Sequence, residues 1–307
     1  LVLSYVGDAA TYLSPYPKNI TARHNIRAAG VKLLDKLHKS NDYDRIIVVG
    51  HSLGSIVGYD ILNYAWHRYS TQHGYSQKPQ HESLEEAQAL IARLYQIQQE
   101  LPPDLEEKLS EKHKSKLIAA YRKSLTNKWR DDWISNAQKA GKELRANGHS
   151  WLVTNFVTMG CPLAHADLLL ASGYDDFMQK ARQREFPTSP PAANNSKGEF
   201  LNEINYQLAE GMKRTTFVPH HAAWTACVVW TNLYFFNPFF LKGDMIGGPL
   251  DVLFGPGIRD MNVKTNIWRG WFSHVRYWSI ASCDEGLGDL APIPSLRRAI
   301  DLAGKDY

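Results

Sequence analysis

The sequence predicts an α/β fold: a doubly wound, mainly parallel sheet with helices on both faces and a helical insertion. Residues 46–49 are four β-branched residues in a row, which is typical of a strand buried on both faces of a parallel sheet. Residues 50–54 then read Gly-His-Ser-Leu-Gly, and apolar residues recur at helical spacing over 56–62. Further apolar segments at 151–159 and 226–235 supply two more expected strands. Buried strands alternating with amphipathic helices indicate βαβ units.

The segment before the first of these strands is expected to be helical. Apolar residues recur at helical spacing from residue 21 to about residue 40, so a helix leads directly into the strand at 46–49. Residues 1–6 are short and apolar and are expected to end a strand or a helix, and the two prolines within 14–17 mark a break.

The Gly-x-Ser-x-Gly segment at 50–54 predicts a nucleophile elbow, because strand, tight turn and helix follow one another there. We expect a Cβ at Gly50 or Gly54 to collide with the neighbouring strand or helix. Ser52 would project its hydroxyl above the sheet at a helix N-terminus, where the dipole favours a developing negative charge. The Leu53 backbone N–H is the expected oxyanion donor. The alternative is a chance match whose glycines only allow close helix packing.

Residues 47–55, Ile-Val-Val-Gly-His-Ser-Leu-Gly-Ser, resemble the elbow of the α/β-hydrolase superfamily in its lipase and serine-esterase branch. The resemblance implies that the acid and then the histidine follow the serine along the chain. Residues 244–250 resemble the acid loop of that branch, in which an Asp precedes a small apolar-Gly-Pro turn, so Asp244 is the expected acid. Asp251 and Asp260 are lesser candidates, and a carboxylate that only caps a turn or helix is the alternative for Asp244.

Residues 270–278 resemble the catalytic-histidine segment of the same branch, with Tyr and Trp three and four residues after His274 at the start of an expected helix. The rivals are weaker. His220 and His221 precede the acid, which is the wrong order, and His51 lies inside the elbow with its side chain expected against the fold. His165 follows the Gly-Cys-Pro turn at 160–162 and could contact substrate. This turn resembles the one that, in lipase-like hydrolases, ends the strand after the elbow helix. A structural role is the alternative for His274.

The resemblance implies a serine hydrolase that acts on carboxylic esters through Ser52, His274 and Asp244 and forms an acyl-enzyme, with no cofactor and no metal. In this superfamily a loop before the elbow normally supplies a second oxyanion donor. Only about fifty residues precede Ser52, so we expect the N-terminal part of the fold to be missing from this chain. The alternative function is a catalytically degenerate hydrolase-fold module that binds or scaffolds.

The expected organisation is a single domain over 1–307 with a helical insertion at 66–150. Gln, Glu, Lys and Arg dominate the insertion, and two amphipathic helices are expected in it. One helix carries an apolar stripe at intervals of four: Leu117, Tyr121, Leu125, Trp129 and Trp133. The pair could form a cap over the site or only a hairpin packed on the domain, and the stripe is expected to be core.

The composition limits which binding partners and which cellular compartment are expected. A net charge of +4 over 307 residues gives no argument for nucleic acid, and leaves weak peripheral contact with anionic membranes open. The expected partner is a small-molecule or lipid-like ester, and the oligomeric state stays open. No signal peptide is visible, and three widely separated cysteines, Cys161, Cys227 and Cys283, favour a reducing, cytoplasmic setting. Cys161 is expected to be a turn residue rather than a nucleophile.

Two segments bear on access to the site. Residues 222–241 carry no charge, but Asn232, Asn237 and Pro238 favour a buried strand at 226–235 over a membrane span. The phenylalanines at 235, 236, 239 and 240 could line an acyl pocket, lie at a lipid interface or belong to the core; with the stripe they predict rates that rise with acyl length. Residues 174–214 are expected to be a long polar loop near the site entrance.

Overall fold

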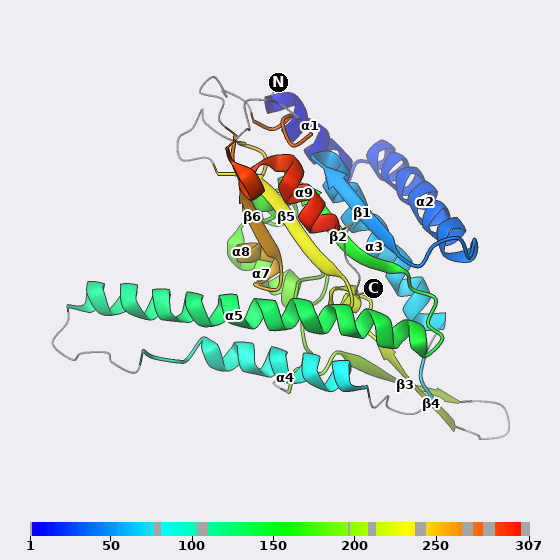
Figure 1. The fold of residues 1–307 in the computed structure, drawn as a ribbon. Helices are drawn as coiled ribbons and strands as arrows, with labels where there is room; N and C mark the ends of the chain where they lie inside the picture. Colours follow the sequence, from blue (N-terminus) through cyan, green and yellow to red (C-terminus); the bar gives the residue numbers. More distant parts are fainter. Residues whose placement is uncertain are drawn as a thin grey trace.

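The computed structural model describes most of the chain and contains a four-stranded sheet (Figure 1). Its strands are β1 (Ile46–His51), β2 (Val153–Met159), β5 (Val229–Phe235) and β6 (Arg259–Val263), in the order β1-β2-β5-β6, and each pairs with its neighbour in parallel. The expected α/β class and parallel sheet are therefore present. The described residues are 2–72, 74–76, 81–102, 110–195, 197–207, 213–236, 244–265, 273–278 and 286–301.

Helices cover both faces of the sheet. On one face α3 (Leu53–Gln72) packs on β1 and β2, with α2 (Pro17–Lys39) and α1 (Val2–Leu13) against its outer side. On the other face α9 (Pro292–Ile300) packs on β2, β5 and β6. Every residue of β2 is buried, as expected for a central strand of a parallel sheet that is covered on both faces. The helix expected over 21–40 corresponds to α2, and residues 2–6 belong to a helix rather than a strand.

The expected insertion contains two long helices, α4 (Glu82–Ile97) and α5 (Glu111–Ala146), whereas residues 66–72 still belong to α3. The two helices run antiparallel, since Ser83 contacts Glu143 while Trp129 donates to the Leu90 carbonyl. Their contact stacks Trp129 on Trp133 with ring centroids 5.7 Å apart, and both rings are buried. The C-terminal half of the apolar stripe is thus core, while Leu117 is exposed.

Helix α5 lies at the amino end of the parallel sheet (Figure 1). Arg130 donates to the carbonyl of Pro256, shortly before β6, and Gly141 faces the carbonyl of Cys227, shortly before β5. Ser52 follows the carboxyl end of β1, which lies at the opposite edge of a parallel sheet. This placement favours a helical hairpin packed on the domain over a cap that closes over Ser52.

Residues 174–214 are not the long polar loop that their composition predicts. They include α7 (Tyr174–Arg182) and β3 (Leu201–Gln207), which forms an antiparallel hairpin with β4 (Lys213–Pro219). Phe177 is fully buried and anchors α7, so one apolar contact outweighs the polar composition of the segment. The remaining short helices are η1 (Pro162–His165), α6 (Ala166–Leu169), η3 (Ala223–Ala226), α8 (Asp251–Phe254) and η5 (Gly288–Leu290).

The uncharged segment at 222–241 contains η3 and then β5, so the expected buried strand is present and begins at Val229. Within the residues that the structure describes, no helix is both long enough and apolar enough to cross a bilayer. Asn237, Pro238, Phe239, Phe240 and Cys283 lie outside the described residues, as do residues 266–272 of the expected histidine segment.

Candidate active site

Ser52 stands at a strained turn between β1 and α3. Its φ is +54°, a left-handed conformation that is uncommon for a residue with a side chain and that clusters at functional sites. The Ser52 N–H donates to the Met159 carbonyl at 2.9 Å, which ties the turn to the end of β2. A Cβ at Gly50 would lie 2.6 Å from Ser55 Cα, so glycine is required there. The expectation was wrong for Gly54, where a Cβ would meet open space.

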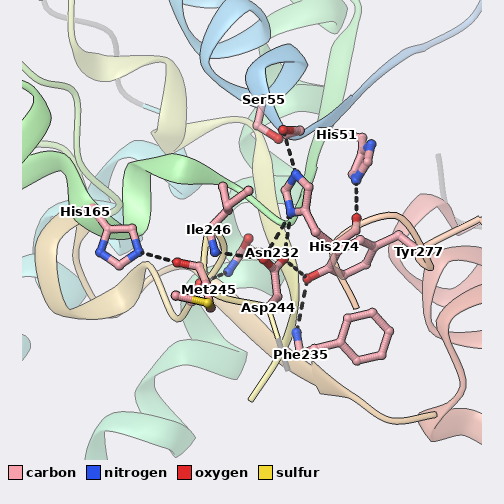
Figure 2. Close-up of polar contacts among 12 residues, drawn as sticks. His51, Ser55, His165, Asn232, Phe235, Asp244, Met245, Ile246, His274 and Tyr277 are labelled. Atoms are coloured by element: carbon pink, nitrogen blue, oxygen red, sulfur yellow. Dashed lines mark hydrogen bonds and ion pairs between the residues drawn. The ribbon is translucent and has the colours of Figure 1, made fainter. Parts of the chain in front are cut away.

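The side chains of Ser52, His274 and Asp244 form one chain of hydrogen bonds. His274 Nε2 lies 2.7 Å from Ser52 Oγ, and His274 Nδ1 lies 3.0 Å from both carboxylate oxygens of Asp244. All three side chains are buried, with His274 and Asp244 at 0 % and 1 % exposure. The structure thus brings together three residues from different segments of the chain, and Figure 2 shows the His274 ring beside the Asp244 carboxylate.

The Asp244 carboxylate is held in its ionised form. Burial alone would raise its pKa, but the hydrogen bond and charge of His274 and the backbone N–H groups of Gly247 and Ile246 bring the pKa below its usual value. Ile246 donates to Oδ1 at 2.8 Å. An ionised carboxylate only accepts hydrogen bonds, so His274 Nδ1 carries the hydrogen and Nε2 is left to accept the Ser52 hydroxyl proton.

Tyr277 gives the carboxylate a further donor. Its hydroxyl donates to Asp244 Oδ2 at 2.8 Å and accepts the Phe235 N–H at 3.1 Å. Burial, with the neighbouring Asp244 charge, raises the Tyr277 pKa well above its usual value, so the phenol stays protonated. The hydroxyl thereby joins the acid to the end of β5 (Figure 2). The sequence placed Tyr277 three residues after His274 without assigning it this role.

His51 binds the backbone of the histidine rather than packing only against the fold. Its Nε2 lies 2.7 Å from the His274 carbonyl oxygen, and since a carbonyl only accepts, His51 Nε2 carries the hydrogen. Burial lowers the His51 pKa, although the bond to His274 opposes that change, which favours the neutral ring. The elbow therefore holds both Ser52 and the backbone of His274.

Gly160 leaves the space in which His274 and Asp244 meet. Its φ is +53°, and a Cβ on it would lie 2.8 Å from Asp244 Oδ2 and 2.9 Å from His274 Nδ1. The turn at 160–162 is therefore one wall of the site. Cys161 beside it is a buried free thiol whose pKa burial raises to about 12, which favours the interpretation as a turn residue.

The two lesser acids are held elsewhere. Asp260 accepts from Asn232 Nδ2 at 2.6 Å and from the backbone N–H groups of Leu250 and Asp251. Burial raises its pKa to about 7. Asp251 pairs with Arg130 at 3.3 Å. Neither carboxylate bonds to His274 among the contacts of the described residues, so they fix the loop after Asp244 and the contact to α5.

The rival histidines also bind backbone carbonyls outside the hydrogen-bonded triad. His220 is buried, its Nε2 lies 2.9 Å from the Ala192 carbonyl, and burial lowers its pKa to about 3. His221 is exposed and lies 2.8 Å from the Arg184 carbonyl. His165 is exposed too, with Nε2 3.2 Å from the Met245 carbonyl, one residue after Asp244. His165 is thus the only one of these three that borders the acid loop.

The structure describes two of the phenylalanines before Asp244, one in the core and one at the surface. Phe235 is buried, and its ring packs on Tyr277 with centroids 4.7 Å apart. Phe236 is 60 % exposed. The buried half of the helical stripe lies at the amino edge of the sheet, whereas Phe235 ends β5 at the carboxyl edge, so Trp129 and Trp133 do not share a pocket with Phe235.

The described residues contain no group of three or more His, Cys, Asp and Glu side chains placed to hold a metal ion. A hydroxyl, an imidazole and a carboxylate in one chain of hydrogen bonds are the arrangement that can activate a serine hydroxyl as a nucleophile. No family model, curated protein or solved structure matches this chain.

Proposed function

We propose that this protein is a serine hydrolase that acts on carboxylic esters, with an α/β-hydrolase fold of the lipase and serine-esterase type. The observation that carries the proposal is the unbroken chain from Ser52 Oγ through the His274 ring to Asp244, at 2.7 Å and 3.0 Å. Nucleophile, base and orienting acid within hydrogen-bond reach are the geometric signature of acyl transfer.

In the proposed reaction, Ser52 Oγ attacks the ester carbonyl carbon while His274 Nε2 takes its proton. Asp244 stabilises the imidazolium that forms and keeps the ring oriented. The tetrahedral intermediate collapses as His274 protonates the leaving alcohol, which produces an acyl-enzyme. Water then attacks the acyl carbon while His274 takes its proton. His274 returns this proton to Ser52 Oγ as the carboxylic acid product leaves.

The oxyanion of the intermediate would be stabilised at the start of α3. The first N–H groups of a helix have no intrahelical acceptor, and α3 begins at Leu53. The Leu53 N–H and the helix dipole are therefore the proposed stabilising groups. We place the reaction in a reducing, cytoplasmic setting, a proposal that the buried free thiols of Cys161 and Cys227 support.

Covalent labelling tests the proposal. A fluorophosphonate probe is expected to label the protein at Ser52, to fail with folded Ser52→Ala, and to label Ser40→Ala as a matched control, because Ser40 lies at the end of α2 away from the site. Hydrolysis of p-nitrophenyl acetate should fall by several orders of magnitude in Ser52→Ala and similarly in His274→Ala, since triad members act as a unit. Undiminished turnover by folded Ser52→Ala would remove the proposed mechanism. A folded wild-type protein that is neither labelled nor active would instead favour the alternative, a degenerate hydrolase-fold binding or scaffold module.

A further inference from the structure

A cavity of about 710 Å³ is lined by residues of α3, by the end of α1 and the first half of α2, and by segments that follow β2. Its volume is within the range of pockets that enclose small organic ligands. The α3 residues that line it are Ile56, Tyr59, Asp60, Asn63, Tyr64 and His67.

These residues continue the helix face that begins at the nucleophile. Ser52 stands four residues, or about one turn, before Ile56. Leu163, in the segment that follows β2, also lines the cavity. Ser52 itself is outside the lining, so Ile56 and Leu163 mark the end of the cavity that lies nearest the nucleophile.

The walls combine apolar surface with one group of charges. Leu163, Leu170, Phe186 and Ile56 contribute apolar side chains, which suit a hydrocarbon chain. Asp60, two turns along α3 from Ser52, is the centre of the charged group.

Arg23 and Tyr12 already donate hydrogen bonds to both oxygens of the Asp60 carboxylate. Arg23 binds both oxygens at 2.9 Å and 3.2 Å, and the Tyr12 hydroxyl donates at 3.0 Å. Asp60 is buried, so its charge is balanced by the Arg23 guanidinium.

Arg27 is a second cation at the same carboxylate. Its nearest nitrogen is 3.5 Å from Asp60 Oδ1, and the guanidinium lies 3.5 Å over the Tyr64 ring, with the side chain only 15 % exposed. It makes no hydrogen bond to any residue in the described ranges, although a guanidinium carries five N–H donors. Arg27 lines the cavity, so the donors that do not face Asp60 are the ones that a ligand inside it could engage. Glu185 is the other carboxylate of the wall and opposes this charge.

We propose that the cavity binds the apolar chain of the ester substrate and that Arg27 binds an anionic group at the far end of that chain. The inference rests on the proposed esterase function and specifies its substrate class: an ester whose chain carries a carboxylate or phosphate. Asp60, beside which Arg27 lies, is eight residues after Ser52, and this corresponds to a rise of about 12 Å along a helix, so chains of about ten carbons are the ones to test. Arginine suits such planar or tetrahedral anions because it donates two parallel hydrogen bonds.

Paired esters test the inference. The p-nitrophenyl monoester of decanedioic acid and p-nitrophenyl decanoate differ only in the terminal carboxylate. We expect kcat/KM to be at least about tenfold higher for the monoester of the diacid, as a hydrogen bond between charged groups provides. Arg27→Met should bring the ratio close to one, Arg27→Lys should retain part of it, and Glu185→Gln should raise it.

Arg68→Gln is the matched control, because Arg68 pairs with Asp35 at 2.9 Å and does not line the cavity. The control should keep the wild-type ratio. A wild-type ratio of one or less, or a ratio that folded Arg27→Met leaves unchanged, would overturn the inference. If decanoate is still hydrolysed through Ser52 in that case, the proposed esterase function stands without it.

Calorimetry on Ser52→Ala separates the two anions and does not need turnover. Decyl phosphate and monomethyl decanedioate are each titrated, with decanol as the uncharged reference. Tighter binding of either anion than of decanol, weakened about tenfold by adding Arg27→Met, supports the inference and identifies phosphate or carboxylate. Equal binding of all three ligands overturns it, whether or not the protein hydrolyses esters.

Discussion

Gly160→Ala is expected to separate the histidine from the acid without unfolding the protein. The added Cβ would lie 2.8 Å from Asp244 Oδ2 and 2.9 Å from His274 Nδ1, both well inside normal contact, so one of these side chains must move. A left-handed alanine also costs about 1–2 kcal/mol of stability. Displacing a catalytic group by 1 Å can cost about 100-fold in rate, and we expect a fall of that size in kcat for p-nitrophenyl acetate.

Gly148→Ala separates the backbone cost from the collision. Gly148 has φ +83°, but a Cβ there would meet nothing within 4 Å. Both variants should lose free energy of unfolding in urea, Gly160→Ala at least as much as Gly148→Ala because of the added collision, and only Gly160→Ala should lose activity. The reasoning is refuted if folded Gly160→Ala keeps kcat within twofold of wild type, or if Gly148→Ala loses as much activity as Gly160→Ala does.

Three further substitutions address the groups around the site. Tyr277→Phe should lower the free energy of unfolding by about 2 kcal/mol in urea titrations, because Asp244 loses a donor to its charge and the Phe235 N–H loses its acceptor; unchanged stability would mean that the hydroxyl is not bonded as described. His51→Phe keeps a ring beside Tyr277 but removes the donor to the His274 carbonyl, so kcat should fall about two- to tenfold, and an unchanged kcat would count against that bond. The pKa of Asp260 is raised from 3.8 to about 7, so between these pH values the folded state binds more protons than the unfolded state. The stability that this group contributes is therefore at its maximum below pH 4 and is lost as the pH rises through 7. Urea midpoints measured from pH 4 to 8 should fall less steeply in Asp260→Asn than in wild type, and parallel curves would contradict the assignment.

The sequence predicted best those elements whose signal is local. The strand at 46–49, the elbow and the helix after it follow one another within twenty residues, and each has its own pattern. The strand that ends at Phe235 could be predicted although it lies in a long uncharged segment, because the polar residues of that segment argued against a membrane span. Asp244 and His274 needed the chain order of a resemblance, since spacing alone does not bring them together.

What the sequence could not supply depends on contacts between distant segments. The His51 ring meets a carbonyl 223 residues away, and Gly160 is required only because Asp244 and His274 meet beside it. The Gly54 expectation failed because the direction of a Cβ at the turn depends on the neighbouring backbone. The place of α5 could not be read from its apolar stripe either, because a stripe shows that a helix is packed but not at which edge of the sheet.

The three side chains of the proposed triad are held by different contacts, and these contacts predict which substitutions will disrupt the site. Ser52 and His51 are consecutive in the elbow, so the same turn carries the nucleophile and binds the backbone of His274. A shift of the elbow would therefore move Ser52 and His274 together and preserve their 2.7 Å contact. Asp244 is instead held by Ile246 and Tyr277, which tie it to its own loop and to β5. Tyr277 lies in the same segment as His274, so Asp244 is joined to that segment by two contacts, one from His274 and one from Tyr277. A Cβ at Gly160 would press on all three side chains, so Gly160 is the point at which the site is most easily broken.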